Sequence, residues 1–508
     1  MTAEGPENLT KGTVRGLSWT YASNGSSAIM QTVYTAVIAR LLAPEDFGLL
    51  AMAMVFQRFG SYFARMGVAQ ALIQKPELDE RDVRVAFTST VMLGLVFGAG
   101  VVAAAPLAGA VFDTADVVPV VRVLALAFIL DSLGQVSVSL LQRELRFREL
   151  AIIDMVTFAV AYFAIGITMA AAGFGVWSLV AVQLAHAGLR SAAWYAGARH
   201  RLTPQAHLPT ARRLFAYGSR ISVISFLEFI GSSLDTFVIG RTAGQAQLGQ
   251  YNRAYLLVTL PFQNIVTGFS GVLFPSLSHI QADRRRLGEV YRSSIAGIAA
   301  VILPIAAGLA VASSEVVRVA IGSQWAGAAA VLPFLAFSGA LNFLSVLGGV
   351  VCDATATLNR KLVLQSVHVV LLGGLLAYAT TFDGLRPFAI ALLVAEAIRH
   401  LLYIRLVSRI IGFGLRDHLR AYAGPVVTAL VVAVAMALFT AALGPVAPVL
   451  VTFLGQLLVG ALVLAAALTY GPLASIRHDA RDRFRRSGLL DGEGRSTRTI
   501  AWLLDFGR

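Results

Sequence analysis

Long runs of apolar residues recur along the whole chain, separated by short polar segments. A helix needs roughly 20 predominantly apolar residues to cross a bilayer. Runs of at least this length predict fourteen membrane-spanning helices, and therefore an all-α integral membrane protein. The predicted spans are residues 14–40, 46–73, 84–111, 117–142, 149–172, 174–197, 213–240, 247–280, 290–313, 326–355, 361–381, 385–408, 419–443 and 447–471.

Basic residues cluster in every second loop between these spans. The alternate loops offer only four scattered arginines, which are Arg40, Arg241, Arg318 and Arg386. Loops rich in Arg and Lys stay on the cytoplasmic side of a membrane. Both termini are therefore predicted to lie in the cytoplasm, which requires an even number of spans.

The composition agrees with this pattern and excludes several classes of protein. Hydrophobic residues make up 57% of the 508 residues and charged residues only 14%, and the mean hydropathy is +0.73. A soluble enzyme, a disordered protein and a nucleic-acid-binding domain need more polar surface than this. The net charge of +13 is explained by arginines that fix topology, so we expect no nucleic-acid partner. No metal-ligand spacing and no P-loop occur, so we expect no metal or cofactor.

A weak internal repeat relates the first and seventh spans. Residues 35–40 and 236–241 both read Thr-x-Val-Ile-x-Arg, and each is followed by a glycine at the same distance, Gly48 or Gly249. Six spans separate the copies, so the repeats are predicted to be parallel, with two six-helix lobes around a central cavity. The predicted divisions are an N-lobe at 1–200, a C-lobe at 201–411, two further helices at 412–472 and a cytoplasmic tail at 473–508.

The same two spans carry matching polar stripes. In the seventh span, the stripe follows a 3, 4, 3 spacing that places its members on one helical face: Ser225, Glu228, Ser232 and Asp235. The equivalent positions, 201 residues earlier, are Asn24, Ser27, Gln31 and Tyr34. We expect these stripes to line a central polar cavity.

Carboxylates inside the spans are the predicted sites of ion coupling, because ionisable groups are costly in hydrocarbon and mark transport pathways. Glu228 is the first candidate for proton or sodium coupling, followed by Asp235 and Asp131. The alternative for Glu228 is a structural ion pair with Arg220 or another arginine.

Five arginines are predicted to supply cations to the cavity, and these are Arg58, Arg65, Arg40, Arg241 and Arg253. Guanidinium groups can grip a phosphate or pyrophosphate through two hydrogen bonds. Arg58 and Arg65 are seven residues apart and share a helical face within the second span. For Arg40 and Arg241, which lie near span ends, interfacial snorkelling is an equal alternative.

Two segments carry a resemblance to a known family. The run from Ile38 to Met54 reads IARLLAPEDFGLLAMAM, and the run from Gly67 to Gln74 reads GVAQALIQ. Together they resemble the beginning of bacterial polysaccharide transporters, the Wzx-type flippases of the multidrug/oligosaccharidyl-lipid/polysaccharide (MOP) superfamily. The topology and the repeat extend the resemblance over nearly the whole chain except the tail.

The resemblance implies a flippase in the bacterial cytoplasmic (inner) membrane that serves cell-surface polysaccharide or lipopolysaccharide biosynthesis. It implies export of a lipid-linked oligosaccharide, usually on undecaprenyl pyrophosphate, by alternating access driven by an H⁺ or Na⁺ gradient or the membrane potential. Further implied partners are membrane lipids and polysaccharide polymerase or assembly proteins. In related flippases the last two spans lie beside the C-lobe and can guide the lipid tail.

Three alternatives remain open at the level of sequence. The first is a drug or cation antiporter of the same fold, which would need more carboxylates than arginines in its cavity. The second is a membrane enzyme such as a ligase or polymerase, but the predicted outer loops are too short for such a catalytic site. The third is a non-transporting scaffold of a polysaccharide-assembly complex.

Overall fold

The computed structural model describes residues 25–64, 72, 78–205, 207, 229–279, 283–355, 357–412, 414–444 and 446–474. Every regular element in this part of the chain is a helix, and eight of the helices are long and apolar enough to span a membrane. The chain divides into two compact units, Met1–Asn252 (unit 1) and Arg253–Arg508 (unit 2). The lobe boundary predicted at residue 200 stays a prediction.

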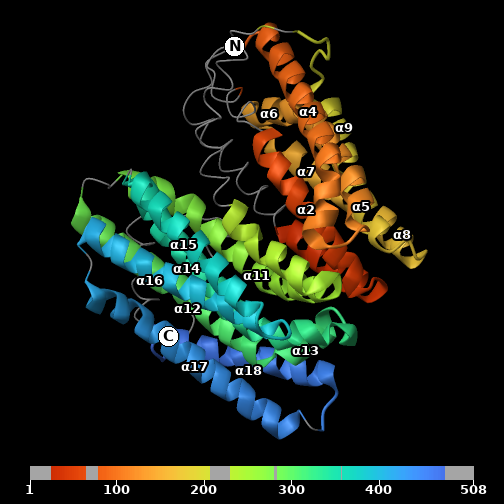
Figure 1. Ribbon diagram of the computed structural model, residues 1–508. Helices are drawn as coiled ribbons and strands as arrows, with labels where there is room; N and C mark the ends of the chain where they lie inside the picture. Colours follow the sequence, from red (N-terminus) through yellow and green to blue (C-terminus); the bar gives the residue numbers. More distant parts are fainter. Residues whose placement is uncertain are drawn as a thin grey trace. The chain divides into compact units, whose positions relative to one another are not determined.

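The described part of unit 1 is drawn from red through yellow to yellow-green in Figure 1. Two of its helices, at 25–41 and 229–242, are identified here by residue number. The others are α2 (Pro44–Ala64), α4 (Glu80–Phe112), α5 (Val117–Leu124), α6 (Leu126–Arg143), α7 (Phe147–Phe158), the π-helix η1 (Ala159–Ile167), α8 (Thr168–Ala171) and α9 (Val176–Ala198).

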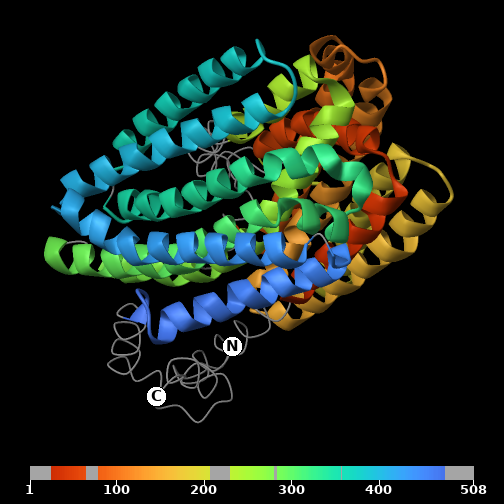
Figure 2. The same cartoon turned by 90° about the horizontal axis from the view of Figure 1, so that it is seen from below.

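Unit 2 begins within α11 (Gly244–His279), which crosses the boundary between the units. The helices that follow are α12 (Arg284–Val311), α13 (Ser313–Ala320), the 3₁₀ turn η2 (Ser323–Trp325), α14 (Ala326–Ala354), α15 (Leu358–Ala379), α16 (Arg386–Ile411), α17 (Leu415–Leu443) and α18 (Val449–Thr469). Figure 2 shows α17 and α18, in blue, running alongside the green helix α12.

Side-chain caps fix where two of the long helices begin. At α4, the Asp79 carboxylate accepts a hydrogen bond from the Asp82 amide at 2.7 Å, and the Asp82 carboxylate accepts one from the Asp79 amide at 3.2 Å. At α12, the Asp283 carboxylate accepts from the Arg286 amide at 3.0 Å. These bonds satisfy amide groups that have no partner in the first turn of a helix.

Small residues allow the helices of each unit to pack closely, as is common between membrane helices. In unit 1, a Cβ on Gly94 of α4 would meet Ser132 of α6, and one on Gly134 of α6 would meet Ser191 of α9. In unit 2, a Cβ on Gly348 of α14 would meet the Tyr403 ring of α16.

The order of packing is the same inside the two units. In unit 1, α6 packs against both α4 and α9, while in unit 2, α14 packs against both α12 and α16. Each unit also contains an eight-residue helix before that central element: α5 comes directly before α6, and α13 comes before α14 with the turn η2 between them. This shared order is what a duplication of six spans would produce.

Two glycines that the repeat predicted as equivalent lie at one helix crossing within unit 1. A Cβ on Gly48 in α2 would overlap the carbonyl oxygen of Gln245 at the start of α11, and a Cβ on Gly249 would overlap the carbonyl oxygen of Pro44. The offset of 201 residues relates Pro44 to Gln245 and Gly48 to Gly249. The crossing is therefore reciprocal. Gly48 faces Gln245, and its repeat equivalent Gly249 faces Pro44, which is the repeat equivalent of Gln245.

Candidate functional site

A polar cavity of about 260 Å³ lies inside unit 1, lined by side chains from four helices. We call it the unit 1 cavity. Its polar lining comes from α2, α4, α6 and α9 and consists of Gln57, Arg58, Ser61, Thr90, Asp131, Ser132, Gln135, Gln183, His186 and Arg190. Met54 and Phe128 complete the wall. Among these side chains are two guanidinium groups and one carboxylate, which leaves one net positive charge with the histidine neutral.

The carboxylate of the cavity is paired across two helices. Nη2 of Arg190 in α9 lies 3.1 Å from Oδ1 of Asp131 in α6, and both side chains are about one third exposed or less than that. The guanidinium carbon of Arg190 also lies 4.8 Å from the centre of the Trp194 ring, within range of a cation–π interaction. Asp131 therefore partly neutralises the positive charge of Arg190, one of the two cations of the cavity.

Arg58 is the second cation of the cavity. It lies on an exposed position of α2 and interacts electrostatically with Asp235 in the helix at 229–242. The Asp235 carboxylate is buried and accepts hydrogen bonds from the Tyr251 hydroxyl at 3.0 Å and from the Thr236 amide at 2.7 Å. Asp235 is thus held by its own neighbours, and Arg58 donates no side-chain hydrogen bond within the described residues, so its N–H groups can serve a ligand.

Two polar atoms at the cavity are buried without a hydrogen bond in the described part of the chain. These are Oε1 of Gln57 and Nε of Arg190. Buried polar atoms are usually satisfied, so such atoms in a cavity wall point to an occupant that supplies the missing bond. An anion with several oxygen atoms could accept from Arg190, and a hydroxyl group could donate to Gln57.

The structure brings only part of the predicted site together. Arg58 and Asp131 line the unit 1 cavity, and Asp235 lies close to Arg58. Arg40 and Arg241 instead lie at helix ends, where their Nη1 atoms donate to the carbonyl oxygens of Ala36 at 2.7 Å and Ala110 at 3.0 Å.

The remaining predicted residues fall into two groups. Those described elsewhere in the structure are Ser27 and Gln31 in the helix at 25–41, Ser232 in the helix at 229–242 and Arg253 in α11. Those outside the described residues are Asn24, Arg65, Ser225 and Glu228.

The sequence interpretation missed two ionisable residues of the cavity, His186 and Arg190. Both lie inside the predicted span 174–197 and follow the same rule that selected Asp131, since ionisable groups within spans are costly. His186 and Arg190 are four residues apart and share a face of α9, which is the signal that could have found them.

Unit 2 contains a second buried polar cluster that the sequence interpretation also missed. Glu396 in α16 is 3% exposed and forms an ion pair with Arg399 one turn later. Its Oε1 lies 3.6 Å from Nε2 of His368 in α15 and 3.4 Å from the amide nitrogen of Asn342 in α14. Arg399 follows Arg190 by 209 residues, close to the repeat offset, so each unit pairs one arginine at this place with a carboxylate.

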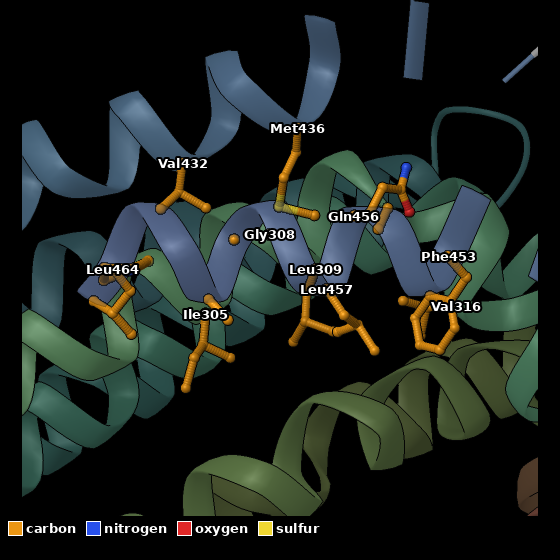
Figure 3. A pocket seen from close by; sticks show the side chains of 14 residues that line it. Ile305, Gly308, Leu309, Val316, Val432, Met436, Phe453, Gln456, Leu457 and Leu464 are labelled. Carbon is orange, nitrogen blue, oxygen red and sulfur yellow. The ribbon is translucent and has the colours of Figure 1, made fainter. Parts of the chain in front are cut away.

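Unit 2 also contains an apolar cavity of about 250 Å³ between α12, α13, α17 and α18. Figure 3 shows Met436 of α17 and Leu457 of α18 among the side chains that line it. Its polar side chain is Gln456, whose amide nitrogen donates to the Thr440 hydroxyl at 2.7 Å. The glycines of the wall, Gly308 and Gly460, leave space that larger residues would fill.

The described residues include no group of three or more His, Cys, Asp or Glu side chains that could hold a metal ion. The guanidinium groups of Arg58 and Arg190 in the unit 1 cavity are suited to binding an anion.

Comparison with solved structures identifies the fold. The chain matches a lipid II flippase MurJ in an inward closed conformation, with a TM-score of 0.70 and 14% identity, over 90% of this chain and 99% of that one. It also matches a multidrug resistance MATE family transporter of the MOP superfamily in an inward-facing conformation, with a TM-score of 0.58 and 14% identity, over 77% and 98% of the two chains. The protein therefore has an all-helical MurJ/MATE-like fold.

Comparison with curated proteins identifies relatives named for succinoglycan, lipopolysaccharide and teichuronic acid biosynthesis. The succinoglycan biosynthesis transport protein ExoT of Rhizobium meliloti is 29% identical over 66% of this chain and 67% of its own length. The lipopolysaccharide biosynthesis protein WzxC of Escherichia coli is 25% identical over 66% and 68%. The teichuronic acid biosynthesis protein TuaB of Bacillus subtilis is 25% identical over 74% and 78%.

A family model described as "Polysaccharide biosynthesis protein" matches residues 37–330, which is more than half of the chain. That range contains α2, α4, α6 and α9, the four helices that form the unit 1 cavity. The chain is an integral membrane protein that belongs to the polysaccharide biosynthesis protein family.

Proposed function

We propose that this protein is a flippase that moves a lipid-linked oligosaccharide, carried on undecaprenyl pyrophosphate, from the cytoplasmic to the outer leaflet of the bacterial inner membrane. It works by alternating access between two six-helix lobes, with fourteen spans in all and both termini in the cytoplasm. The family, the transport relative and the fold support this assignment.

The observation that carries the proposal is the excess of guanidinium over carboxylate in the unit 1 cavity. An antiporter for cationic drugs would need the opposite balance. A pyrophosphate can accept paired hydrogen bonds from Arg58 and Arg190, and each charged hydrogen bond contributes about 1.5–3 kcal/mol. The cavity is thus suited to the head group and not to a cation.

The carboxylate of Asp131 competes with a bound anion for Arg190, because the two side chains lie 3.1 Å apart. When the anion leaves at the outer leaflet, Arg190 can pair with Asp131 again, so neither charge is left without a partner. Asp131, Glu228 and Asp235 stay candidates for coupling this exchange to H⁺ or Na⁺.

The apolar cavity of unit 2 supports the same substrate. Its side chains are almost all aliphatic or aromatic, and it lies beside α17 and α18, the last two helices described. Burial of apolar surface is favourable by roughly 25 cal/mol per Å². Part of the polyprenyl tail of the substrate could therefore lie in this cavity, whose volume of about 250 Å³ is too small for the whole tail.

The test is a liposome assay with the purified full-length protein and an undecaprenyl-pyrophosphate-linked sugar, with and without an imposed proton or sodium gradient. We expect Arg58→Gln and Arg190→Gln each to slow movement between leaflets about tenfold or more, because each removes a charged hydrogen bond. Asp131→Asn should weaken the dependence on the proton gradient. Arg122→Gln, at an exposed position of α5, is the matched control and should transport normally.

Normal transport by Arg58→Gln and Arg190→Gln would remove the proposed head-group site. No movement of any glycan by the wild-type protein would contradict the flippase assignment. Efflux of a cationic dye in that case would indicate an antiporter, and its absence would favour a scaffold.

A further inference from the structure

A second basic cavity lies in unit 2, and nothing in the proposed transport cycle uses it. It has a volume of about 810 Å³, within the range of roughly 300–1,000 Å³ typical of small-molecule sites. Its basic side chains are Arg284, Arg360 and Arg409. These come from the start of α12, the start of α15 and the end of α16, at loops that the charge alternation predicts to be cytoplasmic.

The three arginines have no anionic partner in the described part of the chain. The carboxylates near them are engaged elsewhere: Asp353 with Lys361 at 2.9 Å, Glu289 with Arg285 at 3.4 Å, and Asp283 with the Arg286 amide. All three arginines are exposed and line the cavity. No carboxylate of the described residues neutralises their charges there.

One helix N-terminus adds to the positive potential of this cavity. Arg360 lies in the first turn of α15, which contains no acidic residue and is not capped by the Thr357 side chain. Arg284 is the first residue of α12, whose start is capped by the Asp283 carboxylate. The N-terminus of a helix carries a partial positive charge, so cations there are unfavourable unless an anion joins them.

An exposed apolar face of α15 leads away from the cavity. Asn359 lines the cavity, and the residues that follow it on the same face at spacings of four, four and three are Val363, Val367 and Val370. Their side chains are 63%, 46% and 76% exposed. A ligand whose phosphate lies among the arginines could therefore extend an acyl chain along this face, which a free phosphate does not use.

We propose that this cavity binds the headgroup of an anionic membrane phospholipid at the cytoplasmic face of unit 2. The phosphate contacts Arg284, Arg360 and Arg409 and the uncapped start of α15, and an acyl chain follows Val363 to Val370. Basic pockets between membrane helices on the cytoplasmic side are suited to such headgroups. The site is separate from the unit 1 cavity in sequence and in chemistry, and it does not depend on the transported substrate.

The test is native mass spectrometry of the detergent-solubilised full-length protein titrated with phosphatidylglycerol, with zwitterionic phosphatidylcholine alongside. The variant is Arg284→Gln with Arg360→Gln and Arg409→Gln. We expect it to weaken phosphatidylglycerol binding at least about tenfold and to leave phosphatidylcholine adducts unchanged. The matched control replaces Arg286, Arg405 and Arg416 with Gln, which removes the same charge from exposed positions on the same predicted side. Its binding should stay within about twofold of the wild type.

Equal losses in the two triple variants would overturn the proposal, because they would show a general effect of charge. Displacement of the lipid by inorganic phosphate at matched ionic strength would also overturn it, in favour of a free-phosphate site. If the triple variant does not fold, Arg360→Gln alone should give a smaller loss in the same direction. Because lipid binding is read directly, failure here is distinguishable from failure of the flippase assignment.

Discussion

The guanidinium of Arg190 interacts with two side chains, and one of its N–H groups has no hydrogen-bond partner among the described residues. Asp131 accepts one of its hydrogen bonds, the Trp194 ring faces its charge, and its buried Nε makes no hydrogen bond in the described structure. Asp131 and Trp194 fix the direction of the side chain, so little entropy is lost when a ligand binds. To bind an anion, Arg190 needs only to exchange the Asp131 oxygen for an oxygen of the ligand.

His200 is expected to make the end of unit 1 that follows α9 sensitive to acid. It follows α9, its Nε2 lies 3.1 Å from the Ser137 hydroxyl, and its ring packs against Phe87 and Tyr195. Burial lowers the pKa of His200 below the ordinary value of 6.5, although a hydrogen bond to the carbonyl oxygen of Arg201 opposes the shift. The folded state therefore favours the neutral ring.

The stabilisation from this neutral ring is present above pH 6.5 and is lost as the pH falls through the lowered folded-state pKa. We expect the melting temperature of the wild type, followed by tryptophan fluorescence in detergent, to fall between about pH 7.5 and 5. His200→Gln should melt lower at neutral pH and show a flatter profile. An identical slope in the two proteins would contradict this role for His200.

Individual site residues were predictable from sequence only where burial in a span was enough to mark them. Arg58 and Asp131 interrupt apolar runs, and both line the unit 1 cavity. The pairings were not predictable, because the Arg190–Asp131 pair joins residues 59 positions apart on different helices. Glu396 lies in the predicted span 385–408 and the same rule could have found it, but its neighbours His368 and Asn342 come from two other helices.

At the scale of helices, the apolar runs predict position well and internal irregularity poorly. The predicted span 326–355 corresponds to α14 at Ala326–Ala354. The predicted span 149–172 instead contains the π-helix η1 at Ala159–Ile167 between two α-helical segments. Hydropathy averages over the wider turn of a π-helix, so an apolar run with uniform composition contains no signal for it.

The contact between α12 and the pair α17 and α18 yields a prediction about the apolar cavity of unit 2. A Cβ at Gly460 of α18 would have only Met436 and Val432 nearby, at 3.4 and 4.0 Å, so a leucine there would project into free space. We expect Gly460→Leu to fold with unchanged or higher stability and to slow transport of a substrate with a full-length polyprenyl tail. A short-chain analogue should be moved at the wild-type rate.

Gly374→Leu is the control for this prediction, because nothing lies within 4 Å of a Cβ at that exposed position of α15. Transport of both substrates by Gly374→Leu should equal that of the wild type. Equal inhibition of long-chain and short-chain substrates by Gly460→Leu would indicate a general block in place of a tail site.

At the scale of the whole molecule, the sequence predicts the class of fold but not its internal breaks. The apolar runs lead to an all-helical membrane protein, and the repeat leads to related halves with the same order of packing. The compact units divide at Asn252, and the start of α11 packs against α2 inside unit 1, while the lobe boundary at residue 200 stays a prediction. Such a contact depends on the backbone of two glycines, which hydropathy does not register.

The reciprocal crossing predicts matched effects of two substitutions. Gly48→Ala and Gly249→Ala each place a methyl group against a backbone carbonyl that cannot rotate away. Overpacking of this kind costs about 1–3 kcal/mol, more than the gain in helix propensity of about 1 kcal/mol. Both variants should therefore melt below the wild type in detergent. Gly100→Ala in α4, where nothing lies within 4 Å of a Cβ, should not. A melting temperature equal to that of Gly100→Ala in both variants would contradict the close crossing.

The same crossing bears on how the two halves of such a chain can diverge. In a symmetric dimer of two identical halves, the same glycine and the same carbonyl would form both contacts. Every substitution would then change both contacts at once. In a fused chain, Gly48 with Gln245 and Gly249 with Pro44 are two separate pairs under separate selection. One half can then acquire the arginines of a head-group site, while the other develops a different surface without disturbing the junction.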